Sequence, residues 1–301
     1  MAEVVLIHGM GSTQLDFVGD WTGALCAGSP PEIQQDLMSR TRAANYRDWS
    51  WSTKAGAQGN SFAELEALPP ELQTSLDELA VAWLHSAAAD DSKTGTEAAK
   101  QLDSLNPNQP DGAMGPMEVA RLAVAALAKV PLFGQGTYSA VERTNLTALW
   151  QVTAYANDHE NSKAEVWQRV GAVIDDRTRI MIAHSLGTVV AYEVIHHFGL
   201  ELDLLLTLGS PLGLDGIIYP KLVPEATFPS TVERWVNVAD HDDFVAADPT
   251  LAERFPDHAG QGRTIEDIEV RNSGPFIKHH DITEYLKHDE IRAIFWEALG
   301  G

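Results

Sequence analysis

The sequence predicts an α/β protein with a mostly parallel sheet, helices on both faces and an inserted helical cap. Apolar runs of strand length alternate with segments of helical character, which is typical of such folds. The runs are continuous rather than alternating, as expected for strands buried on both faces. A helical stretch interrupts this alternation. We therefore expect a core made of residues 1–60 and 177–301, with residues 61–176 as the insertion.

The first part of the core begins with a short apolar strand. Val4–Ile7 ends at a glycine-containing turn, which predicts a buried parallel strand entering a tight loop. A helix at about Leu15–Leu25 and a weak strand at Thr41–Tyr46 follow. The sequence thus starts directly on the expected βαβ pattern.

The insertion is predicted to hold helices and one long loop. The loop is expected at Asp90–Pro116, a stretch rich in Gly, Pro, Asn, Asp and Ser. Helical patterns surround it. They cover about Pro69–Leu84, Met117–Val130, Val141–Tyr155 and Ala164–Ile174.

Sheet character then returns for the rest of the chain. Four segments rich in β-branched or other apolar residues predict strands. These are Arg179–Ala183, Leu202–Leu208, Val232–Val238 and Ile265–Val270. Helices are expected at Leu186–Phe198, closed near Gly199, and over most of Ile282–Leu299.

Charge and cysteine content exclude several classes of function. The chain of 301 residues carries 43 Asp and Glu against 21 Lys and Arg, a net charge of −22. Nucleic acids and anionic lipid surfaces require the opposite sign of charge. The sequence shows neither a basic signal-peptide start nor an apolar run that spans a bilayer. Cys26 is the single cysteine, which excludes an intrachain disulfide and a cysteine-rich zinc site. We expect a cytoplasmic protein.

The strongest motif is Ala183-His184-Ser185-Leu186-Gly187. It follows an apolar strand and opens a helix, which is the context that a nucleophile elbow requires. A serine on such a sharp turn needs small residues two positions before and after it, and here these are Ala183 and Gly187. The ordinary alternative is a strand, a turn and a helix with a surface serine. We predict Ser185 to be a catalytic nucleophile.

A second motif, His8-Gly9-Met10-Gly11, follows the first strand. Stabilising an oxyanion requires backbone N–H groups aimed where negative charge develops. We expect one from Leu186, directly after the serine, and one from Met10 in this loop. The alternative is a tight βα turn or a phosphate-binding loop, but neither G-x-G-x-x-G nor the P-loop pattern is present.

Acids and histidines follow the serine in the order that a Ser-His-Asp triad of this type requires. One cluster is Asp240-His241-Asp242-Asp243, after a strand, and the other is Lys278-His279-His280-Asp281. We choose Asp243 as the acid and His280 as the base. Asp240 and His279 remain the alternatives, because loops blur such spacing.

These pieces resemble the α/β-hydrolase superfamily, in particular bacterial lipases and esterases. The resemblance rests on the elbow, on Thr207-Leu208-Gly209-Ser210-Pro211, and on Asp243-Phe244-Val245-Ala246. It implies an α/β-hydrolase fold whose sheet lacks the two early antiparallel strands. It also implies a serine hydrolase that cleaves a small-molecule or lipid-like carboxylic ester with an apolar acyl part, without a cofactor. The resemblance covers the start of the chain and roughly Gln151 to the end, and it does not cover Ser61 to about Val141.

Three alternatives remain beside this prediction. A thioesterase, acyltransferase or macrocyclase would use the same triad with another acyl acceptor. A binding module derived from a hydrolase would keep the fold and lose the activity. A metal site built from Asp240-His241-Asp242-Asp243 together with His279-His280-Asp281 would suit zinc or manganese and a metallophosphoesterase, but it would leave the elbow unexplained.

Overall fold

The computed structural model describes residues 3–9, 17–46, 68–88, 93–104, 122–123, 138–246, 249–274 and 278–300. The chain divides into two compact units. The first consists of Met1–Arg47 and Lys163–Gly301, and the second of Asp48–Ser162. Each is described by itself.

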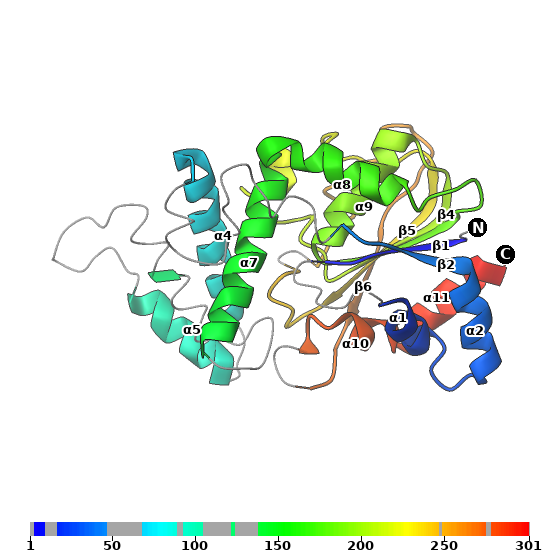
Figure 1. Cartoon of the computed structure of the whole chain (residues 1–301), viewed down its shortest axis with the longest axis horizontal. Helices are drawn as coiled ribbons and strands as arrows, with labels where there is room; N and C mark the ends of the chain where they lie inside the picture. Colours follow the sequence, from blue (N-terminus) through cyan, green and yellow to red (C-terminus); the bar gives the residue numbers. More distant parts are fainter. Residues whose placement is uncertain are drawn as a thin grey trace. The chain divides into compact units, whose positions relative to one another are not determined.

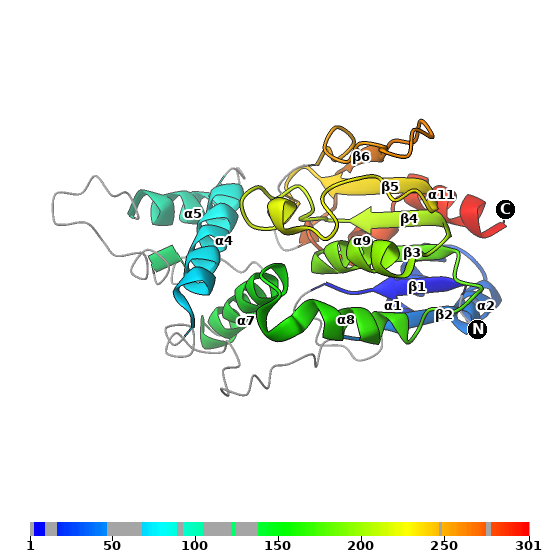
Figure 2. The ribbon, with the colours of Figure 1, turned by 90° about the horizontal axis from the view of Figure 1, so that it is seen from above.

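The first unit is built on an open parallel sheet. Within the described residues it has six strands in the order β2-β1-β3-β4-β5-β6, and every neighbouring pair is parallel. Figure 2 shows this order from β6 at one edge to β2 at the other. The strands are β1 (Val4–Ile7), β2 (Thr41–Ala44), β3 (Ile180–His184), β4 (Leu202–Leu208), β5 (Val232–Asp240) and β6 (Glu266–Val270).

Helices cover both faces of this sheet (Figure 1). One face carries α8 (Ser162–Gly171) and α9 (Leu186–Phe198), and α9 packs on β1 and β3. The other face carries the remaining helices of the unit. They are α1 (Val18–Leu25), α2 (Pro31–Arg40), α10 (Ile282–Leu286) and α11 (Asp289–Gly300). The predicted α/β class is therefore confirmed, with a parallel sheet between two helical layers.

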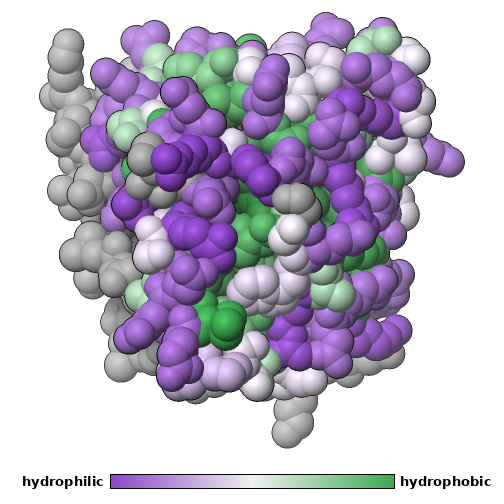
Figure 3. Space-filling view, turned by 90° about the vertical axis from the view of Figure 1, so that its right-hand side faces the viewer, coloured by the Kyte–Doolittle hydropathy of each residue, from purple (hydrophilic) through white to green (hydrophobic). Residues whose placement is uncertain are grey.

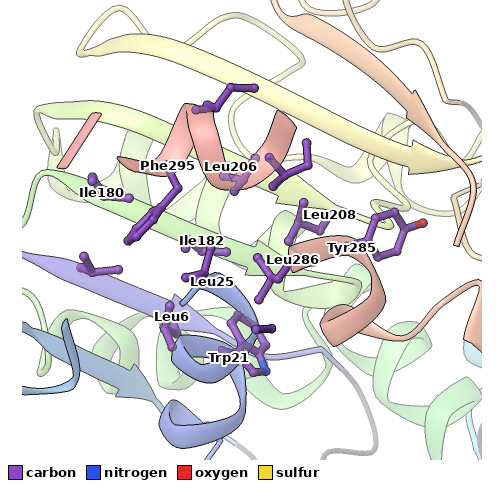
Figure 4. Close-up of a cluster of buried hydrophobic side chains, with 14 of the residues drawn as sticks. Leu6, Trp21, Leu25, Ile180, Ile182, Leu206, Leu208, Tyr285, Leu286 and Phe295 are labelled. Carbon is purple, nitrogen blue, oxygen red and sulfur yellow. The ribbon is translucent and has the colours of Figure 1, made fainter. Parts of the chain in front are cut away.

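The apolar core on the second face joins residues from both ends of the chain. Trp21 and Leu25 from α1 meet Phe295 from α11 over Ile182 and Leu206 of the central strands (Figure 4). Burial of such side chains contributes about 1.5–3 kcal/mol each. The cluster thus ties the first helix and the last helix to the same sheet.

The order of the strands reverses direction at β1. The chain leaves β1 for β2 on one side and then returns to β3 on the other side of β1. In open α/β sheets, ligands bind beyond the carboxyl ends of the strands at such a reversal. Gly9 follows the end of β1 and Ser185 follows the end of β3. The motif that begins at His8 and the motif around Ser185 therefore meet at this point.

The second unit contains helices in its described part. α4 (Pro70–Ala88) packs against α5 (Lys93–Ser104) and α7 (Tyr138–Ala156), and a short turn of helix, η1 (His159–Asn161), follows α7. The prediction of one loop over Asp90–Pro116 was wrong at α5. Glu97-Ala98-Ala99-Lys100-Gln101-Leu102 is a run of good helix formers that the glycine- and proline-rich surroundings obscured. Of the predicted helix Met117–Val130, only residues 122–123 are described, and both are helical.

The predicted C-terminal helix is two helices. α10 ends at Leu286 and α11 begins at Asp289. The Nε2 atom of His288 lies 2.9 Å from the side-chain oxygen of Asn272, beyond β6. Asp289 and Glu290 provide a new acidic first turn, which the dipole of a helix start favours. This contact and these acids account for the break.

Hydrophilic side chains cover much of one face of the first unit (Figure 3). Figure 3 shows the face on which α2 and α11 lie, where hydrophilic side chains predominate and apolar ones form smaller patches between them. Among the described helices, none is both long enough and apolar enough to cross a membrane.

Candidate active site

Ser185 occupies a strained turn between β3 and α9. Its φ is 56° and its ψ is −133°, a conformation that side chains other than glycine rarely adopt. Its backbone N–H donates to the carbonyl of Leu208 at 3.1 Å, which fixes the turn to the end of β4. The side chain is almost fully buried. Strain of this kind costs about 1–3 kcal/mol and collects at functional sites.

Two glycines make room for this turn. A Cβ atom on Gly9 would lie 2.4 Å from the Cβ of Ser185 and 3.0 Å from its Oγ. A Cβ on Gly187 would lie 2.5 Å from the carbonyl oxygen of His8 and 2.6 Å from that of Ile7. The loop after β1 therefore passes directly against the serine turn, and both glycines are required for that approach.

Asp243 and His280 form a buried hydrogen-bonded pair. The Nδ1 atom of His280 lies 2.8 Å from Oδ2 of Asp243, and both side chains are largely buried. A carboxylate can only accept, so Nδ1 carries the proton and Nε2 is the basic nitrogen of the neutral ring. Asp243 comes from the turn after β5, and His280 directly precedes the residue that caps α10.

The surroundings of Asp243 keep it ionised. Burial alone would raise the pKa of this carboxyl, but the charge and hydrogen bond of His280 hold the pKa below its usual value. The Tyr285 hydroxyl donates to Oδ2 at 2.6 Å, and the Val245 backbone N–H donates to Oδ1 at 2.9 Å. These donors act in the same direction. The site therefore holds a permanent negative charge next to the imidazole.

The alternative acid and base form a separate pair. The Nδ1 atom of His279 lies 3.2 Å from Oδ1 of Asp240. Asp240 also accepts from the backbone N–H of Asp242 at 2.7 Å and from that of Asn272. The structure thus pairs Asp243 with His280 and Asp240 with His279. In the second pair, the Asp240 carboxylate connects the turn after β5 to the loop after β6.

The metal alternative falls on this second pair. Among the described residues, Asp240, Asp242 and His279 each offer one ligand atom, and these atoms lie within 4.8 Å of one another. Both oxygens of Asp240 already accept protein hydrogen bonds, and Asp242 pairs with Nδ1 of His241 at 2.9 Å. The hydrogen bonds of these three residues therefore hold the loops after β5 and β6 in place.

His184, directly before the serine, is partly buried and contacts His280. Its Nε2–H donates to the backbone carbonyl of His280 at 2.9 Å, and the two ring centroids lie 4.5 Å apart. Burial, and then the proximity of His280, lower the pKa of His184 to about 3. His184 is therefore neutral at ordinary pH, and it links the serine turn to the histidine loop.

The predicted oxyanion donors are described in part. Leu186 is the first residue of α9, where backbone N–H groups have no partner within the helix and the dipole favours negative charge. Met10 lies outside the described residues, so its part remains a prediction. The loop before it is held in place, because the ring of His8 stacks on Tyr46 with centroids 4.4 Å apart and the Tyr46 hydroxyl donates to the His8 carbonyl.

Sequence reasoning missed two residues of this site. Gly209, after β4, has a φ of 55°, and a Cβ there would lie 2.7 Å from Oδ2 of Asp243 and 3.0 Å from Nδ1 of His280. Its place after an apolar strand was the available signal. Tyr285 lies five positions after His280, and no local pattern indicates that its hydroxyl reaches Asp243.

The site is thus assembled from the carboxyl ends of four strands and from the loop before α10. It contains a strained serine, a buried Asp-His pair and a helix start beside the serine. No protein-family model, curated protein or solved structure matches the chain.

Proposed function

We propose that this protein is a serine hydrolase of the α/β-hydrolase type, which cleaves a carboxylic ester through an acyl-serine intermediate. One observation carries the proposal above the others. Ser185 has a positive φ at a turn between a strand and a helix, next to a loop that tolerates no side chain at Gly9. A strained turn of this kind presents a nucleophile. The pair of Asp243, from the turn after β5, and His280, from the loop before α10, supplies the base that a serine needs.

The proposed acylation step uses these groups in order. Nε2 of His280 takes the proton from Oγ of Ser185 while Oγ attacks the carbonyl carbon of the ester. The negative charge moves to the carbonyl oxygen, where the N–H of Leu186 and the predicted N–H of Met10 donate. The tetrahedral intermediate then collapses. The imidazolium gives its proton to the departing alcohol, and the acyl group stays on Ser185.

Deacylation repeats the sequence with water. His280 takes a proton from water, the resulting oxygen attacks the acyl carbon, and the imidazolium returns its proton to Ser185 as the acid leaves. Asp243 stays ionised in both steps and stabilises the imidazolium. Its low pKa in the folded protein suits that role.

The substrate and the cellular setting are proposed from the sequence. An apolar acyl group agrees with the apolar composition of Met117–Val130, and the part of the insertion that precedes α8 is proposed as a cap that sets chain-length preference. The cytoplasmic location stays a prediction from composition and from the single cysteine.

The test is covalent labelling and turnover of Ser185. Wild-type protein is treated with a fluorophosphonate and digested, and mass spectrometry locates the adduct. We expect it on Ser185, and we expect Ser185→Ala to lower turnover of p-nitrophenyl esters by about 10⁶. Ser210→Ala is the matched control. Ser210 is also buried, but its φ is not positive, and its Oγ lies 2.8 Å from Oγ1 of Thr188. An adduct at another residue, or an active Ser185→Ala variant, excludes the proposal.

A further inference from the structure

Tyr285 has a buried hydroxyl that faces the Asp-His pair. The residue lies in α10 and is fully buried. Its ring sits at the end of the apolar cluster, near Leu208 and Leu286, and its hydroxyl points away from that cluster (Figure 4). A buried phenol requires hydrogen-bond partners, so the direction of its hydroxyl shows which groups it binds.

The hydroxyl of Tyr285 bridges the two ends of one turn. It accepts from the backbone N–H of Asp240 at 2.9 Å and donates to Oδ2 of Asp243 at 2.6 Å. The same turn is closed by the Asp243 N–H, which donates to the Asp240 carbonyl at 3.1 Å. Because an N–H can only donate, the single proton of the phenol must go to the carboxylate.

Oδ2 of Asp243 therefore accepts from two donors. One is the Tyr285 hydroxyl, and the other is Nδ1–H of His280 at 2.8 Å. Burial, and then the charge of Asp243, raise the pKa of Tyr285 well above its usual value. The phenol thus remains a donor throughout the range in which enzymes work.

We propose that Tyr285 is a positioning residue for catalysis, which fixes the Asp243 carboxylate against His280 and shares its negative charge. The inference rests on the proposed function. The hydroxyl anchors the carboxylate to the end of β5, so the pair keeps one geometry while the imidazole gains and loses a proton. A hydrogen bond to the carboxylate also weakens its attraction for the imidazolium.

Both effects have measurable consequences in Tyr285→Phe, which keeps the ring in the apolar cluster. The carboxylate loses one anchor, so kcat for a p-nitrophenyl ester falls about tenfold while KM changes little. The remaining carboxylate–imidazolium attraction strengthens, so the acidic limb of the kcat/KM profile moves to higher pH. Incorporation of para-aminophenylalanine at position 285 restores a donor and moves both values back.

Tyr192→Phe is the matched control. Tyr192 is also fully buried, and its hydroxyl accepts from the Thr227 N–H at 3.2 Å and donates to the Glu225 carbonyl at 2.9 Å. Its loss removes an equivalent buried hydroxyl that has no contact with Asp243. We expect Tyr192→Phe to lower the urea midpoint without moving the acidic limb or the KM-to-kcat balance.

A spectroscopic measurement separates this inference from the proposed function. The imidazole proton between His280 and Asp243 is followed by proton NMR and assigned by its loss in His280→Gln. We expect Tyr285→Phe to shift this resonance and Tyr192→Phe to leave it in place. If fluorophosphonate labels no serine and no ester is cleaved, the hydrolase proposal fails, and the resonance still decides whether Tyr285 positions the pair.

Two results overturn the inference. One is a Tyr285→Phe variant with wild-type kcat, acidic limb and imidazole resonance. The other is equal behaviour of Tyr285→Phe and Tyr192→Phe in all three. If Tyr285→Phe does not fold, the para-aminophenylalanine variant is compared with the wild type instead. Its weaker donor must shift the same imidazole resonance, and an unchanged resonance would overturn the inference.

Discussion

His184 donates a hydrogen bond from Nε2 to the backbone carbonyl of His280 at 2.9 Å, and their ring centroids are 4.5 Å apart. The residue before the proposed nucleophile thus holds the chain at the proposed base. The contact joins the end of β3 to the loop before α10, two segments that are distant in sequence. It couples the position of His280 to the turn that presents Ser185.

This contact predicts acid sensitivity of the fold. The folded protein keeps His184 neutral, with its pKa lowered to about 3 from 6.5, mainly by burial. The unfolded chain binds a proton near pH 6.5 and the folded chain does not. The contribution to stability is therefore complete above pH 6.5 and is lost as the pH falls towards 3.

His184→Phe keeps an aromatic ring and removes this titration. We expect urea midpoints of the wild type to fall more steeply between pH 7 and pH 4 than those of His184→Phe. His197→Phe, at an exposed position of α9, is the control and should follow the wild type. Identical slopes in wild type and His184→Phe would show that His184 titrates normally.

The two Asp-His pairs predict a ranking of four variants. Asp243→Asn and His280→Ala should each lower kcat by about 10⁴ or more, because the imidazole loses its partner or is itself lost. Asp240→Asn and His279→Ala should retain most of the turnover of the folded fraction.

Asp240→Asn should instead lower the free energy of unfolding. Its carboxylate accepts from the backbone N–H groups of Asp242 and Asn272, and each hydrogen bond to a charged group contributes about 1.5–3 kcal/mol. Turnover and urea unfolding are measured on the same preparations. A greater loss of turnover in Asp240→Asn than in Asp243→Asn would assign the acid to the other pair.

Gly209 predicts a backbone-level effect on the same pair. Gly209→Ala places a Cβ 2.7 Å from Oδ2 of Asp243, at a φ of 55°, so either the turn or the carboxylate must move. A displacement of about 1 Å at catalytic groups costs roughly 100-fold in rate. We therefore expect kcat to fall by about that factor.

Gly199→Ala is the control for backbone strain alone. Gly199 has a φ of 62° after α9, and a Cβ there would meet nothing within 4 Å. Both variants carry the left-handed penalty of about 1–2 kcal/mol, which urea unfolding reports. Equal turnover in the two variants would mean that Gly209 does not constrain the pair.

The buried ion pair of Lys163 and Glu193 predicts a stability effect distant from the site. Their Nζ and Oε1 atoms lie 2.6 Å apart, and both side chains are almost completely buried. Lys163→Met leaves the Glu193 carboxylate buried without its cation, which should cost about 3–5 kcal/mol. Adding Glu193→Gln should recover part of this loss.

Arg169→Met provides the comparison on the same helix, α8. Arg169 pairs with Glu165 at 2.7 Å, but both side chains are a third or more exposed, so the cost should be below about 1 kcal/mol. Urea unfolding of the three variants gives the comparison. Equal costs for Lys163→Met and Arg169→Met would show that the buried pair contributes no more than a surface pair.

The local sequence pattern predicted helices and strands correctly where a single signal, such as an apolar run or a terminal glycine, is strong. The strand over Leu202–Leu208 and the helix from Leu186 to Phe198 have the predicted bounds, because a continuous apolar run and a glycine after the helix are unambiguous signals. Asp281 caps α10, with its side chain accepting from the Thr283 N–H, which agrees with the preference for Asp at helix starts. The prediction failed at α5, where the surrounding composition outweighed a short helical run.

The sequence by itself determined the parallel α/β architecture and the strand-turn-helix context of Ser185, since both follow from the order of apolar runs and from small residues near one serine. Only the tertiary structure decided which acid meets which histidine. Asp240 and Asp243 stand three positions apart and His279 and His280 are adjacent, so no local rule separates them. The register of β4 and β5 and the anchoring of the loop before α10 bring Asp243 to His280, and the fold of α10 brings the Tyr285 hydroxyl to the same carboxylate oxygen. Hydrogen bonds between segments distant in sequence depend on how elements pack, and that information is spread over the whole core.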